Sequence, residues 1–238
     1  GGGIGMSVVS SYGDLEKAIE KTSSLAEKAF GDGSIFLEKF ITNARHIEIQ
    51  VFGFGKKGSV HLFERDCSMQ RRYQKIIEES PAPGISKDVI DHMALSAVKL
   101  ASDVNYQGAG TIEFIYDIDS KKYYFLEMNT RIQVEHPVTE LVTNNDLISM
   151  QINFAFSRKT KFLDQAKIST YGHAIECRVY AEDPEKNFLP SPGKLLKMFL
   201  PHPPNGIRLD WGFEEKDEIS FYYDPMIGKI ISHGLVRE

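Results

Sequence analysis

The feature that most constrains this chain is a pair of strand-like segments separated by a short polar turn. Residues 110–117 (GTIEFIYD) and 122–129 (KYYFLEMN) are rich in β-branched and aromatic residues. The turn between them is too short for a crossover connection, so the two strands must pair antiparallel. If the turn is centred near residue 120, Glu113 lies opposite Glu127 and both side chains leave the same face of the sheet.

The rest of the chain predicts helices beside further antiparallel strands. Apolar residues at helical spacing alternate along the chain with strand-like segments, some of which are joined by short glycine-containing turns. This pattern predicts an α+β fold of antiparallel sheets with flanking helices. Helices are expected at residues 14–30, 86–104 and 138–156, and strands at 34–40, 45–54, 59–66, 110–117, 122–129, 172–180, 189–200 and 220–234.

Charge and composition exclude several classes of protein. The chain has 238 residues, of which 42% are hydrophobic and 26% charged, as in ordinary globular proteins. Its 28 Lys and Arg against 33 Asp and Glu give a net charge of −5, so we expect neither nucleic acid nor a membrane as partner. The two cysteines, Cys67 and Cys177, form no metal-ligand spacing and suggest a reducing compartment. The glycine-rich start without a Met suggests a piece of a longer protein.

Polar residues gather at the end of the second strand of the hairpin. Facing carboxylates repel each other, so Glu113 and Glu127 need a shared proton, an arginine or a divalent cation, unless they form a solvated face beside a lysine. In the loop that follows, Asn129 offers another oxygen to a metal, Arg131 a planar fork for a carboxylate or bicarbonate, and Glu135 a base. A strand that delivers this many polar groups into a loop predicts a functional site.

Two other segments are candidates for binding anions. Three cations fall within residues 71–75 of a net-acidic chain, which indicates either a site for a small anion or a solvated basic face. Cys67 beside them has no partner spacing for catalysis and is interpreted as a packed thiol. Residues 1–6 match neither dinucleotide-binding nor P-loop patterns, so they are either a loop that closes over phosphates or a linker.

Seven blocks of the sequence closely resemble biotin carboxylases and occur in that family's order. The resemblance implies an ATP-grasp fold with a lid subdomain at 1–65, the remainder of the core with the metal and bicarbonate site at 66–165, and part of the C-terminal subdomain at 166–238. The blocks are ERDCSMQRR with QK at 64–75, EESPAPG at 78–84, EMNTRIQVEHPVTE at 127–140, GHAIECR at 172–178, AEDP at 181–184, LPSPGK at 189–194 and YYDPMIGK at 222–229.

The resemblance also implies roles for individual residues. Glu135, Arg131, Arg178 and Lys75 are the implied catalytic residues, with Glu135 as the base that deprotonates bicarbonate. The implied ligand sets are Gly2, Gly3, Gly5, Glu38, Lys39, Ile41, His46 and Gln70 for ATP; Glu113, Glu127 and Asn129 for Mg²⁺ or Mn²⁺; Lys75, Arg131, Gln133 and Val134 for bicarbonate; and Arg178 and Asp224 for biotin.

The implied activity is the ATP- and bicarbonate-dependent carboxylation of biotin on a carrier domain through carboxyphosphate, the first half-reaction of a biotin-dependent carboxylase. The implied partners are the biotin carboxyl carrier domain, a carboxyltransferase subunit or domain, and a second copy in a homodimer. Arg208 matches a position that is associated with dimerisation in the bacterial enzymes of the family. The expected setting is fatty acid biosynthesis in the cytoplasm, with the mitochondrion as alternative. The final acceptor is chosen outside this chain.

Two alternatives remain open at this level. Another ATP-grasp ligase, such as a carbamoyl-phosphate-forming or amino-acid ligase, would lack the segment Gln133 to His136. A piece without the family's N-terminal subdomain is expected to be inactive alone and could bind nucleotide without turnover. Tyr73 replaces a residue that is commonly His or Asn in the family, so its contact on the ribose side is open.

Overall fold

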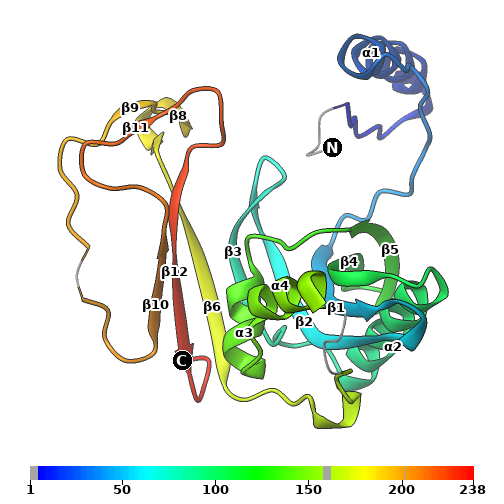
Figure 1. Cartoon of the computed structure of the whole chain (residues 1–238). Helices are drawn as coiled ribbons and strands as arrows, with labels where there is room; N and C mark the ends of the chain where they lie inside the picture. The colour runs from blue at the N-terminus through cyan, green and yellow to red at the C-terminus, as the bar shows by residue number, and fades with distance from the viewer. Residues whose placement is uncertain (1–4, 158–161, 201) are drawn as a thin grey trace.

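In the computed structural model, which describes residues 5–157, 162–200 and 202–238, one antiparallel sheet runs through most of the molecule (Figure 1). Its eight strands lie in the order β10-β12-β6-β3-β2-β1-β4-β5. The expected fold class, antiparallel sheet with flanking helices, is confirmed. The helices and strands are α1 (Tyr12–Phe30), β1 (Ala44–Phe54), β2 (Ser59–Arg71), β3 (Gln74–Ser80), α2 (Lys87–Asp103), β4 (Gln107–Asp117), β5 (Lys122–Asn129), α3 (His136–Thr143), α4 (Leu147–Ser157), β6 (His173–Tyr180), β7 (Glu182–Asp183), β8 (Leu189–Pro190), β9 (Gly193–Lys194), β10 (Ile207–Trp211), β11 (Glu218–Ile219) and β12 (Met226–Gly234).

The register expected for the β4–β5 hairpin is confirmed. Glu113 is the Cα partner of Glu127, and a β-bulge follows directly after Glu113. The bulge shifts the register for the rest of the hairpin without disturbing this pair. The two carboxylates therefore lie side by side at the end of the hairpin that leads into the loop after β5.

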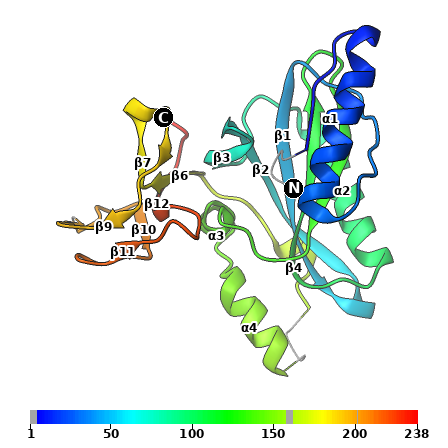
Figure 2. The ribbon, with the colours of Figure 1, turned by 90° about the horizontal axis from the view of Figure 1, so that it is seen from above.

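Both faces of the central strands are covered. On β1, Ile47, Ile49 and Val51 belong to a core that includes residues of α2. The opposite face of β1 carries Glu48 and Gln50, which are also fully buried. Figures 1 and 2 show α2 on one side of β1, β2 and β4, with α3 and α4 on the other. A strand whose two faces are both covered buries its polar side chains as completely as its apolar ones.

A second hairpin, which the sequence did not predict, joins β2 to β3. Arg71 pairs with Gln74, and the two residues between them, Arg72 and Tyr73, both have positive φ, at 51° and 64°. This is the backbone of a type I′ turn, which usually carries Asn or Gly. The hairpin brings β3 alongside β6, so β3 joins the N-terminal and C-terminal parts of the chain in one sheet.

Four expected elements differ from the structure. Residues 34–40 form no strand, because no neighbouring strand is described beside them, and Phe36 and Leu37 are 80% and 73% exposed. The helix expected at 138–156 is two helices, because Asn144 adopts a left-handed conformation that ends α3. Only short parts of 189–200 are strand: Pro192 separates β8 from β9, and residues 195–200 pair with no described strand, with Leu196 and Phe199 exposed. The strand expected from residue 220 begins at Met226, after the turn at Asp224.

The other expected helices are confirmed, with ends within two residues of those predicted. Helix α1 has no buried residue and lies away from the sheet in Figure 1, joined to β1 by the extended segment 31–43. Within the described residues, no helix has the length and apolar character needed to cross a membrane.

A glycine on β1 makes a close approach that can be tested. A Cβ added to Gly53 would lie 2.2 Å from the carbonyl oxygen of Tyr106, which accepts a hydrogen bond from the Gly55 N–H at 2.9 Å. We expect Gly53→Ala to lower the free energy of unfolding by about 1–3 kcal/mol, the usual cost of overpacking, measured by urea denaturation. Gly212→Ala is the control, since its Cβ would meet nothing closer than 3.9 Å. Equal losses in both variants would contradict this reason.

Candidate functional site

A half-buried lysine surrounded by carboxylates forms the centre of the site. Lys75 on β3 donates hydrogen bonds to Glu48 Oε2 on β1 at 2.6 Å, to Glu113 Oε1 on β4 at 2.8 Å and to Glu135 Oε1 after β5 at 2.7 Å. We call these four residues the Lys75 cluster. Four separate parts of the chain meet in it, so it forms only when the sheet is complete.

The cluster holds its charges by mutual compensation. Burial alone would lower the pKa of Lys75, but Glu48, Glu135 and Glu113 outweigh it and hold that pKa well above its usual value. Burial also opposes ionisation of Glu48, yet Arg65 and Lys75 keep its pKa well below the usual range. At the edge of the cluster, burial opposes protonation of His46, while Glu113 and Glu48 raise its pKa to about 9.

Glu135, the expected base, lies between two cations. Its Oε1 accepts from Lys75 at 2.7 Å and its Oε2 accepts from Arg178 Nη2 at 3.0 Å, and the residue is only 2% exposed. Arg178 on β6 is itself held by Glu78 on β3, whose Oε1 accepts from Nε at 2.6 Å. The structure thus brings together the expected catalytic residues Lys75, Glu135 and Arg178.

The three residues expected to bind the metal lie close together. The Asn129 Nδ2 donates to Glu113 Oε1 at 3.1 Å and to Glu127 Oε1 at 3.3 Å, so the three side chains lie together. Glu127 is exposed, whereas Glu113 is buried. Two hard carboxylate ligands with one open side suit Mg²⁺ or Mn²⁺, which usually complete their coordination with water and phosphate oxygens. His46 Nε2, 3.2 Å from Glu113 Oε2, flanks this group.

The loop that follows β5 is fixed on both sides. The side chain of Gln133 donates from Nε2 to Glu113 Oε1 at 2.8 Å, and its backbone oxygen lies 2.9 Å from His136 Nδ1. The backbone oxygen of Val134 accepts from Lys229 Nζ on β12 at 2.6 Å. Gln133 and Val134, two of the expected bicarbonate ligands, are therefore held beside the Lys75 cluster.

The remaining expected residues lie outside the cluster. Arg131 is exposed and its one described hydrogen bond runs from Nη1 to the Ile132 oxygen at 3.1 Å. Gln70 donates to the Cys67 carbonyl at 2.8 Å, and Asp224 accepts from the Met226 N–H at 3.0 Å. Three other expected ATP ligands lie in the segment that connects α1 to β1: Glu38 and Lys39 are exposed, and Ile41 is half-buried. Gly5 lies in a turn, and Gly2 and Gly3 lie outside the described residues.

The basic segment 71–75 is divided by the β2–β3 hairpin. Only Lys75 faces the cluster. Arg71 forms an ion pair with Glu182 and lies 4.1 Å from the centre of the Phe188 ring, and Arg72 donates to the Asn187 carbonyl at 2.9 Å. The two arginines thus contact the segment that follows β6.

Four residues of the site were not found from the sequence: Glu48, Arg65, Glu78 and Lys229. Glu48 alternates with apolar residues on its strand, as on a solvated face. Arg65 stands between Glu64 and Asp66, and Glu78 stands next to Glu79, so both lie in charged stretches that are usually exposed. No signal in the sequence indicates that these side chains are buried together.

Two protein-family models match this chain. Residues 1–162 match the family "Carbamoyl-phosphate synthase L chain, ATP binding domain", and residues 176–238 match "Biotin carboxylase C-terminal domain". The chain belongs to the biotin carboxylase family. The second match is what separates biotin carboxylases from other enzymes with this ATP-binding domain.

Relatives and solved structures agree with this membership. The chain is 48% identical over 231 residues to methylcrotonoyl-CoA carboxylase subunit alpha, mitochondrial, of Rattus norvegicus, which covers 97% of this chain and 32% of that protein. It is 48% identical over 238 residues to biotin carboxylase 1 of Bacillus subtilis, covering 100% and 52%. The crystal structure of the Campylobacter jejuni biotin carboxylase with β,γ-ATP superposes with a TM-score of 0.93 at 45% identity, again covering 100% and 52%. The chain therefore spans between about a third and a half of these biotin carboxylases and carboxylase subunits.

Two buried carboxyl groups face each other next to the cluster. Glu78 on β3 is the Cα partner of Glu176 on β6, and both are fully buried. Glu78 Oε2 and both oxygens of Glu176 have no hydrogen-bond partner within the described residues, although Lys229 Nζ lies 3.8 Å from Glu176 Oε1. Burial raises the pKa of Glu78 to about 7 and that of Glu176 to about 8, against the opposing effects of Arg178 and Lys229.

This pair predicts a pH dependence of stability. The folded protein keeps both protons to higher pH than the unfolded chain, so this contribution to the free energy of unfolding is full below pH 4.5 and is lost as the pH rises to about 8. We expect Glu176→Gln to gain stability relative to the parent protein as the pH rises through this window, by at most about 1.4 kcal/mol per pKa unit. Urea denaturation at several pH values measures it.

The exposed Glu185→Gln is the matched control, and its stability is expected to follow that of the parent protein at every pH. A difference between Glu176→Gln and the parent protein that does not change with pH would contradict the shared burial of these two carboxyl groups.

Proposed function

We propose that the protein containing this chain carboxylates biotin on a carrier domain, using ATP and bicarbonate through carboxyphosphate. The observation that carries the proposal is the placement of Glu135 between Lys75 and Arg178, next to the facing pair Glu113 and Glu127. A carboxylate held by two cations beside a candidate metal site suits the activation of a small anion. The names of the relatives, which are biotin carboxylases and subunits of biotin-dependent carboxylases, support the same reaction.

In the first step, bicarbonate lies against Lys75, Arg131, Gln133 and the backbone of Val134, and Glu135 takes its proton. Removing that proton makes an oxygen of bicarbonate a better nucleophile toward the γ-phosphorus of ATP. The bond to the β,γ-bridging oxygen breaks, which yields ADP and carboxyphosphate. Lys75 and Arg178 hold Glu135 by both oxygens, so the base keeps its position through the step.

Separate sets of residues are proposed to bind the metal and the nucleotide. Glu113, Glu127 and Asn129 would hold Mg²⁺ or Mn²⁺: the two carboxylates fit a hard cation, and Asn129, whose Nδ2 donates to both, would turn its amide oxygen toward it. When bound, the metal neutralises charge on the phosphoryl oxygens. The ATP ligands in this proposal are Gly2, Gly3, Gly5, Glu38, Lys39, Ile41, His46 and Gln70. The biotin carboxylase domain of the Hydrogenobacter thermophilus 2-oxoglutarate carboxylase was solved in complex with MgADP and bicarbonate, which supports the pairing of these two ligands.

In the second step, carboxyphosphate breaks down to CO₂ and phosphate beside biotin. The phosphate takes the proton of the biotin ring nitrogen, and the nitrogen then attacks CO₂. Negative charge develops on the ureido oxygen, where Arg178 stabilises it as a fixed cation, with Asp224 near the ring. Glu78 fixes the guanidinium through Nε and leaves its other edge for Glu135 and substrate.

The proposed division of the chain follows these roles: a lid at 1–65, the core with the metal and bicarbonate site at 66–165, and part of the C-terminal subdomain at 166–238. The gap between the two family matches, from 162 to 176, supports the second boundary. The separation of α1 from the sheet supports a distinct lid (Figure 1). The proposed bounds also include β1 and the first half of β2, which belong to the main sheet.

The proposed partners are the biotin carboxyl carrier domain, a carboxyltransferase subunit or domain, and a second copy of the protein. The 2-oxoglutarate carboxylase domain is described as a dimer, which supports the last of these. Relatives named for methylcrotonoyl-CoA, pyruvate and urea carry different acceptors. Fatty acid biosynthesis is accordingly one of several settings, and a cytoplasmic location is proposed, with the mitochondrion, named for the rat relative, as alternative.

ADP release by the full-length protein with Mg²⁺ tests the proposal. We expect release that requires bicarbonate and rises when free biotin is added. ADP release that does not change with bicarbonate would indicate another ATP-grasp ligase. Nucleotide binding without any release would indicate a protein that binds without turnover.

Substitution of the carboxylates is expected to separate their roles. Glu113→Gln and Glu127→Gln should each abolish metal-dependent ADP release, because each removes a charged ligand. Glu135→Gln should lower bicarbonate-dependent release by about 10²–10⁴-fold, the usual effect of losing a general base, while leaving ATP binding within about twofold. Steady-state assays and nucleotide titration measure both, with Glu185→Gln as an exposed control. Unchanged activity in the three site variants would refute this assignment.

Arg178→Ala is expected to divide the two half-steps. Biotin carboxylation should fall by about 10²–10³-fold, as on losing one oxyanion donor, and bicarbonate-dependent ATP cleavage should fall less, since Lys75 still holds Glu135. The ratio of carboxybiotin formed to ADP released is the measurement. Arg72→Ala is the control arginine, since its side chain is exposed and donates to the Asn187 carbonyl. An unchanged ratio in Arg178→Ala would make Arg178 purely structural.

A further inference from the structure

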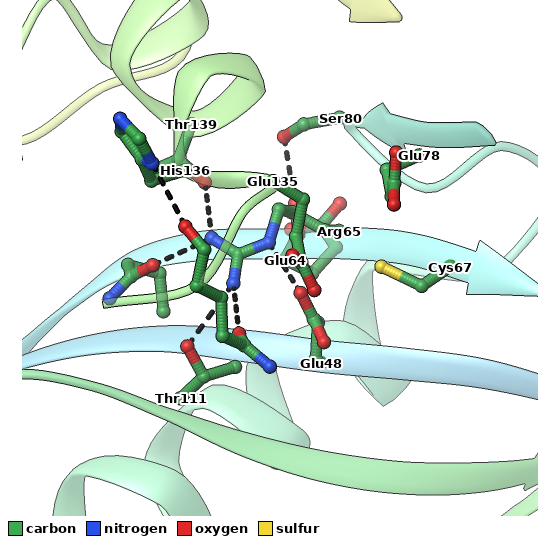
Figure 3. Close-up of polar contacts among 12 residues, drawn as sticks. Glu48, Glu64, Arg65, Cys67, Glu78, Ser80, Thr111, Glu135, His136 and Thr139 are labelled. Atoms are coloured by element: carbon green, nitrogen blue, oxygen red, sulfur yellow. Dashed lines mark hydrogen bonds and ion pairs between the residues drawn. The ribbon is translucent and has the colours of Figure 1, made fainter. Parts of the chain in front are cut away.

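Arg65 on β2 is a completely buried arginine whose side chain is fully occupied by hydrogen bonds. Its five N–H groups donate to five different side chains, as Figure 3 shows around the centre of the view. The acceptors are Glu48 Oε1, Gln50 Oε1 at 2.6 Å, Thr139 Oγ1 at 2.9 Å, Thr111 Oγ1 at 3.1 Å and Gln133 Oε1 at 2.8 Å.

Burying a charged arginine in this way gives little or no net gain in folding free energy. A buried ion pair typically gains little or nothing over well-packed apolar residues, because both charges lose their hydration. Burial opposes protonation of Arg65, yet Glu48 and Glu135 keep its pKa above the usual value. The acceptors come from β1, β4, α3 and the loop after β5. The guanidinium therefore orients several elements at once, which an apolar side chain of the same size could not do.

One consequence concerns the amide of Gln133. Its Oε1 accepts from Arg65 Nη2 at 2.8 Å, so its Nε2 points the other way and donates to Glu113 Oε1 at 2.8 Å. A flipped amide would place N–H against N–H at Arg65 and oxygen against oxygen at Glu113. Arg65 thus decides that Gln133 presents a donor, not an acceptor, to the Lys75 cluster.

A second consequence concerns Glu48. One of its oxygens accepts from Arg65 Nε and the other accepts from Lys75 Nζ at 2.6 Å. The same guanidinium therefore sets the carboxylate that anchors Lys75. None of the five acceptors of Arg65 is an expected ATP, metal or biotin ligand. One of them, Gln133, is an expected bicarbonate ligand.

We propose that Arg65 is a positioning residue for bicarbonate: it fixes the Gln133 amide so that the second N–H of Nε2 can donate to the anion, and it fixes the Glu48 carboxylate that holds the positive charge of Lys75 beside the anion. This inference rests on the proposed function and adds a residue that acts on bicarbonate through others. A lysine at this position has a single ammonium and cannot serve Glu48 and Gln133 with the fixed geometry of a guanidinium.

The first test is Arg65→Lys in the full-length protein. Losing one oriented hydrogen bond to the anion corresponds to about a tenfold effect. We expect KM for bicarbonate to rise about tenfold or more, while KM for ATP stays within about twofold. In the double variant Arg65→Lys with Gln133→Leu, the rise of KM for bicarbonate above that of Gln133→Leu alone should be smaller than the rise that Arg65→Lys causes in the parent protein, because part of the action of Arg65 passes through Gln133. Effects that multiply would overturn the proposal.

Thr139→Val is the matched control. It removes one acceptor of Arg65 on α3 and leaves the contacts to Gln133 and Glu48. We expect it to lower the melting temperature, as the loss of a buried hydrogen bond does, without changing KM for bicarbonate. A comparable rise of KM in Thr139→Val would show that general destabilisation is the cause, and would overturn the positioning role.

Two further measurements keep the test decisive. If Arg65→Lys does not fold, Gln133→Glu leaves Arg65 and its acceptor in place but replaces the donor with an oxygen. An unchanged KM for bicarbonate would then overturn the proposal.

NMR of the Gln133 side-chain amide, assigned by its loss in Gln133→Leu, needs no turnover. We expect the two N–H chemical shifts to differ from those of a free glutamine side chain in the parent protein and to move toward the free values in Arg65→Lys; identical shifts in the two proteins would overturn the proposal.

These outcomes separate the two proposals. Absence of bicarbonate-dependent ADP release in the parent protein would refute the proposed function, and the NMR comparison would still decide whether Arg65 orients the amide. Bicarbonate-dependent release in the parent protein with normal kinetics in Arg65→Lys would refute the positioning role alone.

Discussion

Compensation of charge away from water is the constraint on which this site depends. Arg65, Lys75 and Arg178 face the carboxylates of Glu48, Glu113 and Glu135; within this set Lys75, Glu48 and Glu135 each contact more than one partner of opposite sign, and the other three each contact one. An ion taken from water without such partners costs several kcal/mol, so no member of this set is stable alone. The sheet, the hairpin and the loop after β5 can therefore be understood as the scaffold that brings three cations to three anions.

Much of this arrangement could be predicted from the sequence where a local rule decides the outcome. The pairing of Glu113 with Glu127 follows from a short turn and the two-residue repeat of a strand, which leave one register. The loop after Glu127 was recognised because five polar functional groups follow an apolar strand. The blocks that resemble biotin carboxylases, such as 127–140, then implied roles for individual residues. The convergence of Lys75, Glu135 and Arg178 supports these roles.

The rest could not be predicted because tertiary context decides it. Arg72 and Tyr73 form a tight turn without the Asn or Gly that usually marks one, so β3 was missed. Glu48 and Gln50 alternate with apolar residues as a solvated face would, and only the helices on that face bury them. Phe36 and Leu37 have the composition of a strand but no neighbour to complete it. For the same reason, nothing near Arg65 in the sequence identifies its five acceptors, which come from four distant segments.

The pairing of β3 with β6 has a consequence for how the molecule holds together. The family matches end at 162 and resume at 176, yet hydrogen bonds between β3 and β6 cross that interval. A protease that cuts in the interval would leave the halves attached, because their strands remain partners in one sheet. If the halves then separated, each would expose a long unpaired strand edge, a common template for self-association. The parts of the chain that match two different family models are thus joined by strand pairing as well as by the backbone.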